Sequence, residues 1–349
     1  MRNAFSIFCC VVLLIQLPEK SASQIFEAPI DSLIRKSLVL TINQKFDSAE
    51  TVCAEIMNLD WQNPIGTLML AATLQSKMMD YETDQWESDF FSNIDKSIRL
   101  SEHLLKTTEK SASLYFIIGS AYCYKSFYCG KKERLLSAFK NATKGIDYMN
   151  RALAIDSTVY DAYLAIGSYK YWKSRKLNFI TWLPFLSDDR SQGIQMIQKT
   201  IEHGSISRYA AINGLAWIYL DAGRIDEAIQ TATMGCQAFP ESRFFLWCLA
   251  DCYFKKPDFV NAKLNYQKIL DSILTKEFNN HYNEIVCRYK IAACLHALEK
   301  YRESKTQCEA IATLSLSEPI AKRAASYLKK AQQLKQMNEN ALYHANITD

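Results

Sequence analysis

Two neighbouring stretches of this chain carry the same residue pattern at a spacing of 34 positions. The first, YAAINGLAWIYLDAGRIDEAIQTATMGCQAFPE (209–241), has the pattern of two amphipathic helices separated by Gly223, a residue that permits the left-handed conformation at a helix end. The second, RFFLWCLADCYFKKPDFVNAKLNYQKIL, begins at Arg243. The equivalent positions are Ala216 and Ala250, Tyr219 and Tyr253, and Ala228 and Ala262. Such a period predicts stacked helix pairs, in which each unit buries its apolar face against its neighbours.

A small residue, an aromatic residue, a small residue opening the second helix and a closing proline together resemble the tetratricopeptide-repeat (TPR) family. The 209–241 unit ends at Pro240, whereas the unit from Arg243 lacks the proline. Weaker copies start near residue 285, with Ser304 in place of the usual alanine, and cover 30–64. The resemblance implies an all-α fold, a right-handed superhelical solenoid of TPR-like antiparallel helix pairs. It specifies a fold rather than a function.

The middle of the chain repeats itself at a longer spacing of 48 residues. Residues 113–155 and 161–203 share these identical pairs: Tyr115/Tyr163, Ile118/Ile166, Gly119/Gly167, Ser120/Ser168, Lys125/Lys173, Ser126/Ser174, Leu135/Leu183, Gly145/Gly193 and Ile146/Ile194. We expect two lengthened TPR-like units, each with an extra piece of about fourteen residues between its helices, judged against the 34-residue period. The first extra piece is FYCGKKERLLSAF, and the second contains LNFITWLPFL (177–186).

The second extra piece concentrates large apolar side chains in a short run: Phe179, Trp182, Phe185 and Leu186. Exposing all of them would forfeit on the order of 1.5–3 kcal/mol each. We therefore expect this insert to fold onto the first helix of its own unit, near Tyr171 and Trp172. It is either a permanent part of the core or a removable cover over the partner site. Pro184 explains why it is not simply a longer helix.

Glycine and proline are scarce, with 10 Gly and 7 Pro in 349 residues, which favours helices over turn-rich sheet folds. The apolar fraction of 49% allows a substantial core and argues against disorder. The 41 basic and 37 acidic residues give a net charge of +4, which is too balanced to indicate a nucleic-acid partner. The basic clusters GKKER (130–134) and KSRK (173–176) are interpreted as solvated helix ends.

These patterns divide the chain into successive parts. They are a signal peptide at 1–23, divergent N-terminal TPR-like repeats at 24–110, two lengthened repeats with inserts at 111–208, TPR repeats at 209–316, a C-terminal capping helix at 317–336 and a tail at 337–349. A capping helix with a polar outer face is expected because the last repeat of a stack has no further neighbour to cover it.

The N-terminus has the features of a targeting segment. Arg2 precedes an apolar run at 5–17, Pro18 interrupts that run, and SAS (21–23) supplies the small residues that a signal peptidase reads. We expect cleavage near Ser23 and export to the periplasm, the cell envelope or the medium; an uncleaved anchor is the alternative. No later stretch has the length of a membrane span, so we expect no transmembrane segment in the mature chain.

Nine cysteines follow residue 23: Cys53, Cys123, Cys129, Cys236, Cys248, Cys252, Cys287, Cys294 and Cys308. They fall on apolar helix positions without a CxxC motif, so we expect most to be buried free thiols, with one or two disulfides as the alternative. Cys248 and Cys252 are one turn apart, but two thiols are at most half a metal site, and we expect no metal and no cofactor.

Motifs for catalysis are missing from the sequence. The five histidines form no HExxH, and there is no GxSxG, Walker-type or GxGxxG motif. Acidic pairs such as Asp188–Asp189 suit helix N-termini better than hydrolysis. We therefore expect no catalytic residues, while a site assembled from scattered side chains remains an alternative.

In the TPR family, certain positions of each first helix line the concave face of the superhelix. Carried onto the matched units, the resemblance implies a partner-binding groove formed by Tyr171, Trp172, Asn213, Trp217, Phe244, Trp247, Asp251, Lys255 and Tyr289. Three tryptophans on successive first helices indicate an apolar surface that binds something or is covered by the chain itself. We expect an exported, non-enzymatic scaffold that binds a protein or peptide there; the alternative is a binder of an apolar or aromatic small ligand.

Overall fold

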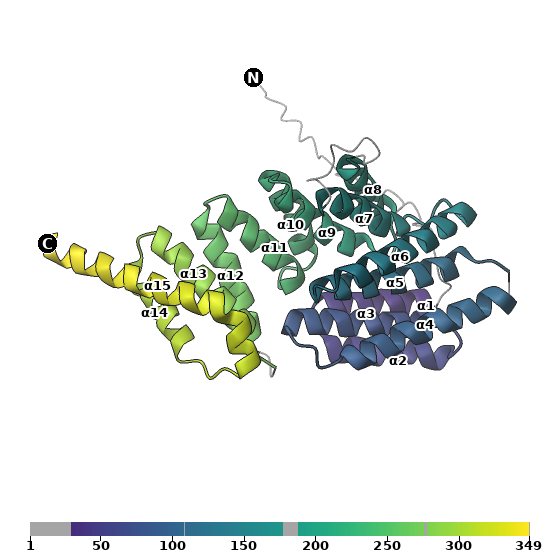
Figure 1. Ribbon diagram of the computed structural model, residues 1–349, viewed down its shortest axis with the longest axis horizontal. Helices are drawn as coiled ribbons and strands as arrows, with labels where there is room; N and C mark the ends of the chain where they lie inside the picture. Colours follow the sequence, from purple (N-terminus) through teal and green to yellow (C-terminus); the bar gives the residue numbers. More distant parts are fainter. Residues whose placement is uncertain (1–28, 108, 177–187, 276–277, 349) are drawn as a thin grey trace, which may run out of the picture.

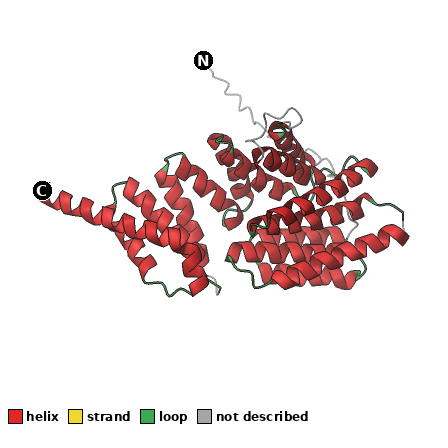
Figure 2. Cartoon of the chain, in the orientation of Figure 1, coloured by secondary structure: helices red, strands yellow, loops and turns green. Residues whose placement is uncertain are grey.

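The computed structural model describes residues 29–107, 109–176, 188–275 and 278–348. These residues form fifteen α-helices and no strand (Figures 1 and 2). The helices are α1 (Ile30–Ile42), α2 (Phe46–Leu59), α3 (Pro64–Tyr81), α4 (Glu87–Thr107), α5 (Ala112–Lys131), α6 (Leu135–Ile155), α7 (Ala162–Lys176), α8 (Arg190–His203), α9 (Arg208–Asp221), α10 (Ile225–Ala238), α11 (Arg243–Lys255), α12 (Phe259–Leu274), α13 (Tyr282–Ala297), α14 (Tyr301–Ala312) and α15 (Glu318–Thr348). The predicted signal peptide and the insert at 177–186 lie outside the described residues.

Successive helices form antiparallel pairs, each packed on the next, as the repeats predict. We call the odd-numbered helix of each pair the first helix and the even-numbered one the second helix. First helices of neighbouring pairs also contact one another, as α5 contacts α7 and α9 contacts α11. This arrangement places the first helices on the inner side of the curved stack. The predicted fold class, an all-α right-handed superhelical solenoid of antiparallel helix pairs, is confirmed.

The glycines shared by the two lengthened units mark where the two helices of each pair cross. Gly119 of α5 faces Gly145 of α6, and Gly167 of α7 faces Gly193 of α8. A methyl group added at Gly167 would lie 2.5 Å from the carbonyl oxygen of Gly193. Only glycine allows so close an approach of two helix backbones. The 48-residue spacing thus corresponds to one repeated helix crossing.

The first extra piece, FYCGKKERLLSAF, is not an insert between helices. Its residues extend the C-terminal end of α5 to Lys131 and form the start of α6 at Leu135, so only 132–134 connect the two. The prediction was wrong because this stretch contains no proline and both helices can simply grow longer. Its cluster GKKER lies at the turn, as expected for a solvated helix end.

The end of α9 follows the sequence closely. Gly223 has a φ of 76°, which is the left-handed conformation that the sequence predicts for it. Its amide donates to the carbonyl of Leu220, which closes the last turn of the helix. Helix α10 then ends at Ala238, two residues before Pro240.

The last helix is longer than predicted. We expected a capping helix to end at 336 and a tail to follow, but α15 continues to Thr348. Asn338 explains part of the extension because its side chain is buried. It donates to Ser304 Oγ at 2.8 Å and lies 2.7 Å from His296 Nδ1, which ties this turn to α13 and α14.

The two halves of the superhelix meet at one contact between helix ends. The C-terminal ends of α1 and α3 lie against the N-terminal ends of α11 and α13, while the bodies of α13–α15 and of α1–α4 lie on opposite sides of the view in Figure 1. Gln44 Oε1 accepts from the Arg243 amide at 3.1 Å, and Asn280 Nδ2 donates to the Tyr81 carbonyl at 2.9 Å. We call this contact, with the Asp80–Arg243 ion pair at its centre, the closing seam.

Within the described part of the chain, no helix is both long enough and apolar enough to cross a bilayer.

Candidate functional site

The inner face of the superhelix is closed over its N-terminal half. Ile34 of α1, Gln75 of α3 and Phe116 of α5 occupy first-helix positions that turn inward, and all three are buried. Gln75 Nε2 donates to the Tyr124 carbonyl at 3.0 Å, which fills the space between α3 and α5. Ile206, in the loop before α9, packs against the same core. These helices therefore offer no open groove at those positions.

Four aromatic residues at inner positions of α7, α9 and α11 are partly exposed. Trp172 and Phe244 are 39% and 36% exposed, and Trp217 and Trp247 are half-buried. Trp217 packs on the core shared by α7, α9 and α11, and the Trp247 ring lies 6.4 Å from that of Tyr266, centroid to centroid. Four large aromatic groups thus form a partly exposed apolar surface, which we call the aromatic strip.

Tyr171 lies beneath this strip rather than on it. Its side chain is 1% exposed, and its ring packs edge-on against Trp172 at 5.1 Å between centroids. Its hydroxyl donates to Asp221 Oδ2 at 2.7 Å, and Arg175 Nε donates to the same oxygen at 2.9 Å. Burial and the hydrogen bond to Asp221 raise the pKa of Tyr171, so the phenol stays neutral. Tyr171 positions Trp172 and has no surface with which to touch a partner.

The polar residues predicted for the groove are largely engaged within the chain. Asp251 accepts a hydrogen bond from Tyr266 and lies 3.2 Å from Lys290 Nζ. Lys255 Nζ donates to the Leu220 carbonyl at 3.0 Å, near the C-terminal end of α9. Both groups brace neighbouring helices, so a partner would have to compete for them.

Asn213 and Tyr289, the remaining predicted groove residues, lie in different surroundings. Asn213 Oδ1, on α9, is buried and accepts no hydrogen bond from the described residues. A buried acceptor without a donor is costly, and because this oxygen is covered by the chain itself it offers no contact to a partner. Tyr289, on α13, packs edge-on against Tyr327 of α15 with ring centroids 5.7 Å apart. The last helix therefore packs against Tyr289, which is half-buried.

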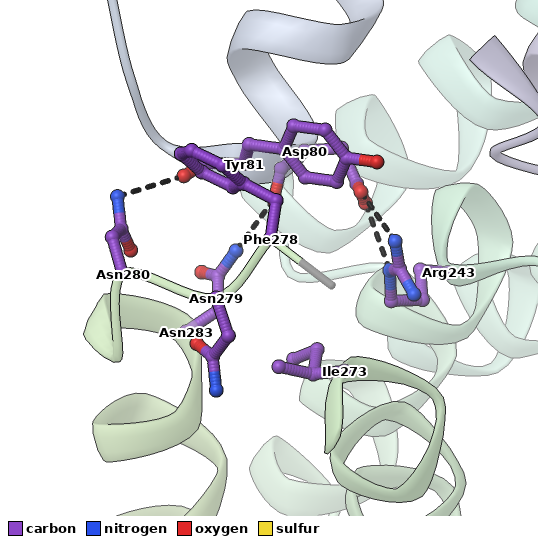
Figure 3. A pocket seen from close by; sticks show the side chains of 8 residues that line it. All are labelled: Asp80, Tyr81, Arg243, Ile273, Phe278, Asn279, Asn280 and Asn283. Carbon is purple, nitrogen blue, oxygen red and sulfur yellow. Dashed lines mark hydrogen bonds and ion pairs between the residues drawn. The ribbon is translucent and has the colours of Figure 1, made fainter. Parts of the chain in front are cut away.

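The closing seam holds a small hollow, shown in Figure 3. Its volume is about 10 Å³, room for little more than one water molecule. Arg243 reaches across it to Asp80, and Asn283 Nδ2 donates to the Asp80 carbonyl at 2.8 Å. The sequence analysis did not identify these residues. Arg243 could have indicated a buried ion pair, because it is an arginine at the start of an otherwise apolar first helix.

A second cavity, of about 220 Å³, lies on α12, α13 and α14. Both cavities are smaller than the roughly 300–1,000 Å³ typical of small-molecule sites. Neither includes a residue of the aromatic strip. These two cavities therefore give no support to the alternative of a small apolar ligand.

In the part of the chain that the structure describes, no three His, Cys, Asp or Glu side chains gather where they could hold a metal ion. All nine cysteines after residue 23 are free thiols, and seven of them are buried, as predicted for most. The Sγ atoms of Cys248 and Cys252 are 4.0 Å apart in the core.

Comparisons with known proteins bear on the fold. No protein-family model and no curated protein matches the chain. The APC/C hetero-tetramer Cut9–Hcn1 is similar in structure, with a TM-score of 0.52 and 14% identity over 90% of this chain and 55% of that one. This chain thus spans only about half the length of that structure.

Two further structures are similar at lower scores. The C-terminal part of a TPR repeat-containing protein from Cytophaga hutchinsonii aligns with a TM-score of 0.45 and 17% identity, over 84% of this chain and 99% of that chain. Yeast Tom70 aligns with a TM-score of 0.35 and 12% identity, over 92% and 85%. At such identities the likeness concerns the fold alone, and it agrees with the TPR-like solenoid predicted from the repeats.

Proposed function

We propose that this protein is an exported, non-enzymatic scaffold that binds a peptide or protein segment on the aromatic strip of α7, α9 and α11. The observation that carries the proposal is the exposure of Trp172 and Phe244 on the inner face of α7 and α11, whereas Ile34, Gln75 and Phe116 on the inner face of α1, α3 and α5 are buried. Large aromatic side chains held half-open on rigid helices are typical anchors of protein interfaces.

The strip also suits an extended chain better than a compact molecule. Trp172, Trp217 and Trp247 lie on three successive first helices, so a ligand that meets all of them must cross those helices. The bound segment would place apolar side chains against the three tryptophans.

A peptide-display selection on the chain starting at Gln24 tests this proposal. We expect enriched peptides to carry aromatic or large aliphatic residues, because these fill apolar surface. Trp172→Ala and Phe244→Ala should each weaken binding of a selected peptide by about tenfold or more, as measured by fluorescence anisotropy. Both side chains are more than one-third exposed, so the fold should tolerate their removal.

Val260→Ala is the matched control. Val260 is 60% exposed and lies on α12, a second helix, away from the strip. Its removal should leave the affinity unchanged. If no peptide is enriched, or if the strip variants bind as well as the Val260 variant, the strip is not the binding surface.

The export half of the proposal depends on the N-terminal sequence. The apolar run at 5–17, Pro18 and the small residues at 21–23 support processing near Ser23. N-terminal sequencing of the protein from its native host should give Gln24 as the first residue. An intact Met1 on protein recovered from the cytoplasm would contradict export.

A further inference from the structure

A second apolar surface lies at the turn between α5 and α6. Phe127, Leu135, Leu136 and Phe139 are 56%, 68%, 90% and 58% exposed. They lie on the last turn but one of α5 and the first turn of α6, where both helices are longer than the 34-residue unit requires. We call these four residues and the turn 132–134 the hairpin tip. Such a cluster is unusual on a monomeric surface and marks an interaction site.

The hairpin tip is held in place by contacts at its base. Ser126 Oγ donates to the Ala138 carbonyl at 2.8 Å, which joins α5 to α6. Lys131 forms an ion pair with Glu82 at 3.2 Å, and Lys132 forms one with Asp84. The apolar side chains are therefore presented by an anchored hairpin, and their exposure is not a consequence of fraying.

Lysines lie beside the tip, and the turn itself carries one exposed carboxylate, Glu133. Lys140 and Lys144 follow the apolar residues along α6, and both are exposed. Helix α7 ends at the same edge of the stack, because it runs antiparallel to α6, and it contributes Lys173 and Lys176. Lys144 Nζ lies 5.0 Å from the centre of the Tyr122 ring, and Lys173 Nζ lies 6.0 Å from that of Tyr169. Among the described residues these four lysines form no ion pair with a carboxylate, so an anionic partner can meet them.

The shape and size of the hairpin tip favour a membrane surface over a protein partner or a second copy of the chain. The tip is a projection, so a protein partner would need a matching hollow. Self-association is disfavoured because four side chains supply on the order of 500 Å², below the roughly 800 Å² per partner of a stable interface. A bilayer surface is deformable, accepts leucine and phenylalanine at the headgroup boundary, and attracts lysine when its lipids are anionic.

We propose that the hairpin tip docks this protein on the surface of a membrane that contains anionic lipids. Leu135, Leu136 and Phe139 enter the headgroup boundary, and Lys140 and Lys144 meet the phosphate groups. Since α5 and α6 precede the aromatic strip in the stack, docking leaves the strip free for a protein partner. The inference stands independently of the proposed function.

Vesicle sedimentation tests this inference. The chain starting at Gln24 keeps every described helix and lacks the apolar run at 5–17, which would otherwise bind lipid itself. We expect it to sediment with vesicles of phosphatidylcholine and phosphatidylglycerol, and to bind vesicles of phosphatidylcholine alone more weakly. Raising the salt from about 0.1 M to about 0.5 M should reduce binding, because the Debye length shortens.

Paired variants locate the contact. The double variant Leu136→Ser/Phe139→Ser should lower the vesicle partition coefficient by about tenfold or more. Lys140→Gln/Lys144→Gln should lower it by about fivefold for each lysine, and only on the anionic vesicles. The control Val260→Ser/Leu264→Ser removes two side chains that are 60% and 53% exposed on α12, and it should bind like the wild type.

Three results would overturn the proposal. The first is a wild-type chain that does not sediment with anionic vesicles. The second is equal binding by the tip and control variants. The third is a dimer in sedimentation velocity that Leu136→Ser/Phe139→Ser converts to a monomer without any vesicle binding, which would assign the tip to a second copy of the chain.

Discussion

Arg243 and Asp80 lie 163 residues apart in the chain, yet their side chains form a buried ion pair that joins α11 to α3. Arg243 Nε lies 2.9 Å from Asp80 Oδ1, and the two side chains are 3% and 12% exposed. Units of a simple solenoid contact only their neighbours, so their stabilities add almost independently. This pair connects the second unit to the sixth.

Breaking the pair should therefore be costly. Arg243→Ala leaves Asp80 buried without its cation, and we expect it to lower the free energy of unfolding by about 3–5 kcal/mol. Urea unfolding followed by circular dichroism measures this loss. We also expect the transition to split or broaden, because the N-terminal units would no longer be coupled to the C-terminal ones.

Two further variants test whether the loss of stability comes from the burial of the ion pair or simply from the loss of a charge. Lys256→Ala removes an exposed pair with Asp226 and should change stability by less than about 1 kcal/mol. Replacing both partners, Asp80→Leu/Arg243→Met, should recover much of the loss, since apolar groups can substitute for a buried pair. An Arg243→Ala variant as stable as Lys256→Ala would show that the seam does not hold the two halves of the superhelix together.

The glycine crossing of α7 and α8 gives a second prediction. Gly167→Ala places a methyl group 2.5 Å from the Gly193 carbonyl oxygen, which is backbone and cannot rotate away. The two helices must separate, and we expect a loss of about 1–3 kcal/mol or more in urea unfolding.

Gly214→Ala is the matched control for that crossing. Gly214 also lies inside a first helix, but the nearest atom to an added methyl group is Leu164 Cδ1 at 3.9 Å. This variant should stabilise the protein by up to about 1 kcal/mol, because alanine favours the helix. Similar effects at the two positions would mean that the close approach is not what requires Gly167.

The sequence predicts the fold well where a feature depends on residues that are close together in the chain. The 34-residue period locates α9 and α10, and Gly223 adopts the positive φ expected of a helix-ending glycine. The duplicated glycines could be found by sequence comparison, although their role as crossing points required the structure. Such features depend on contacts within one unit or between adjacent units, which a residue pattern records directly.

Features that depend on the whole superhelix could not be predicted. Whether Asp80 meets Arg243 depends on small rotations between successive units, added over half the chain. The same accumulated rotations decide which inner positions are buried. Tyr171 is buried and Tyr289 packs against Tyr327 of α15, although the repeat pattern gives both as groove positions. A residue pattern names the inner face, but it does not indicate how much of that face stays open.

The cysteines provide a third prediction. Burial raises the pKa of Cys294 to about 12 and that of Cys308 to about 11, so these thiols stay protonated and unreactive near neutral pH. We expect Ellman's reagent to label few thiols in the folded chain starting at Gln24 and all nine after denaturation, with or without prior reduction. A count that reaches nine only after reduction would establish disulfides.

Glu284, at the start of α13, provides a prediction on pH. Burial raises the pKa of this carboxyl, but hydrogen bonds from His281, Arg288 and Asn279 outweigh it and hold the pKa below its usual value. The Arg288 Nε and Asn279 Nδ2 atoms lie 2.8 Å and 2.9 Å from the carboxylate oxygens. A carboxyl with a lowered pKa stabilises the fold above its unfolded pKa, and this contribution is lost as the pH falls through its folded pKa.

We therefore expect Glu284→Gln to lower the free energy of unfolding by about 1.5–3 kcal/mol at pH 7, because charge-assisted hydrogen bonds are lost. The difference from the wild type should begin to shrink as the pH falls below about 4.3, where this carboxyl takes up a proton in the unfolded chain, and it should vanish only below the lower pKa of the folded state. Urea unfolding at pH 7 and at progressively lower pH measures both effects. Glu303→Gln, at an exposed residue 3.7 Å from Lys300, should change stability little at any pH. A Glu284→Gln deficit that stays constant into acid would mean that the lost contribution comes from packing and not from the ionised carboxylate.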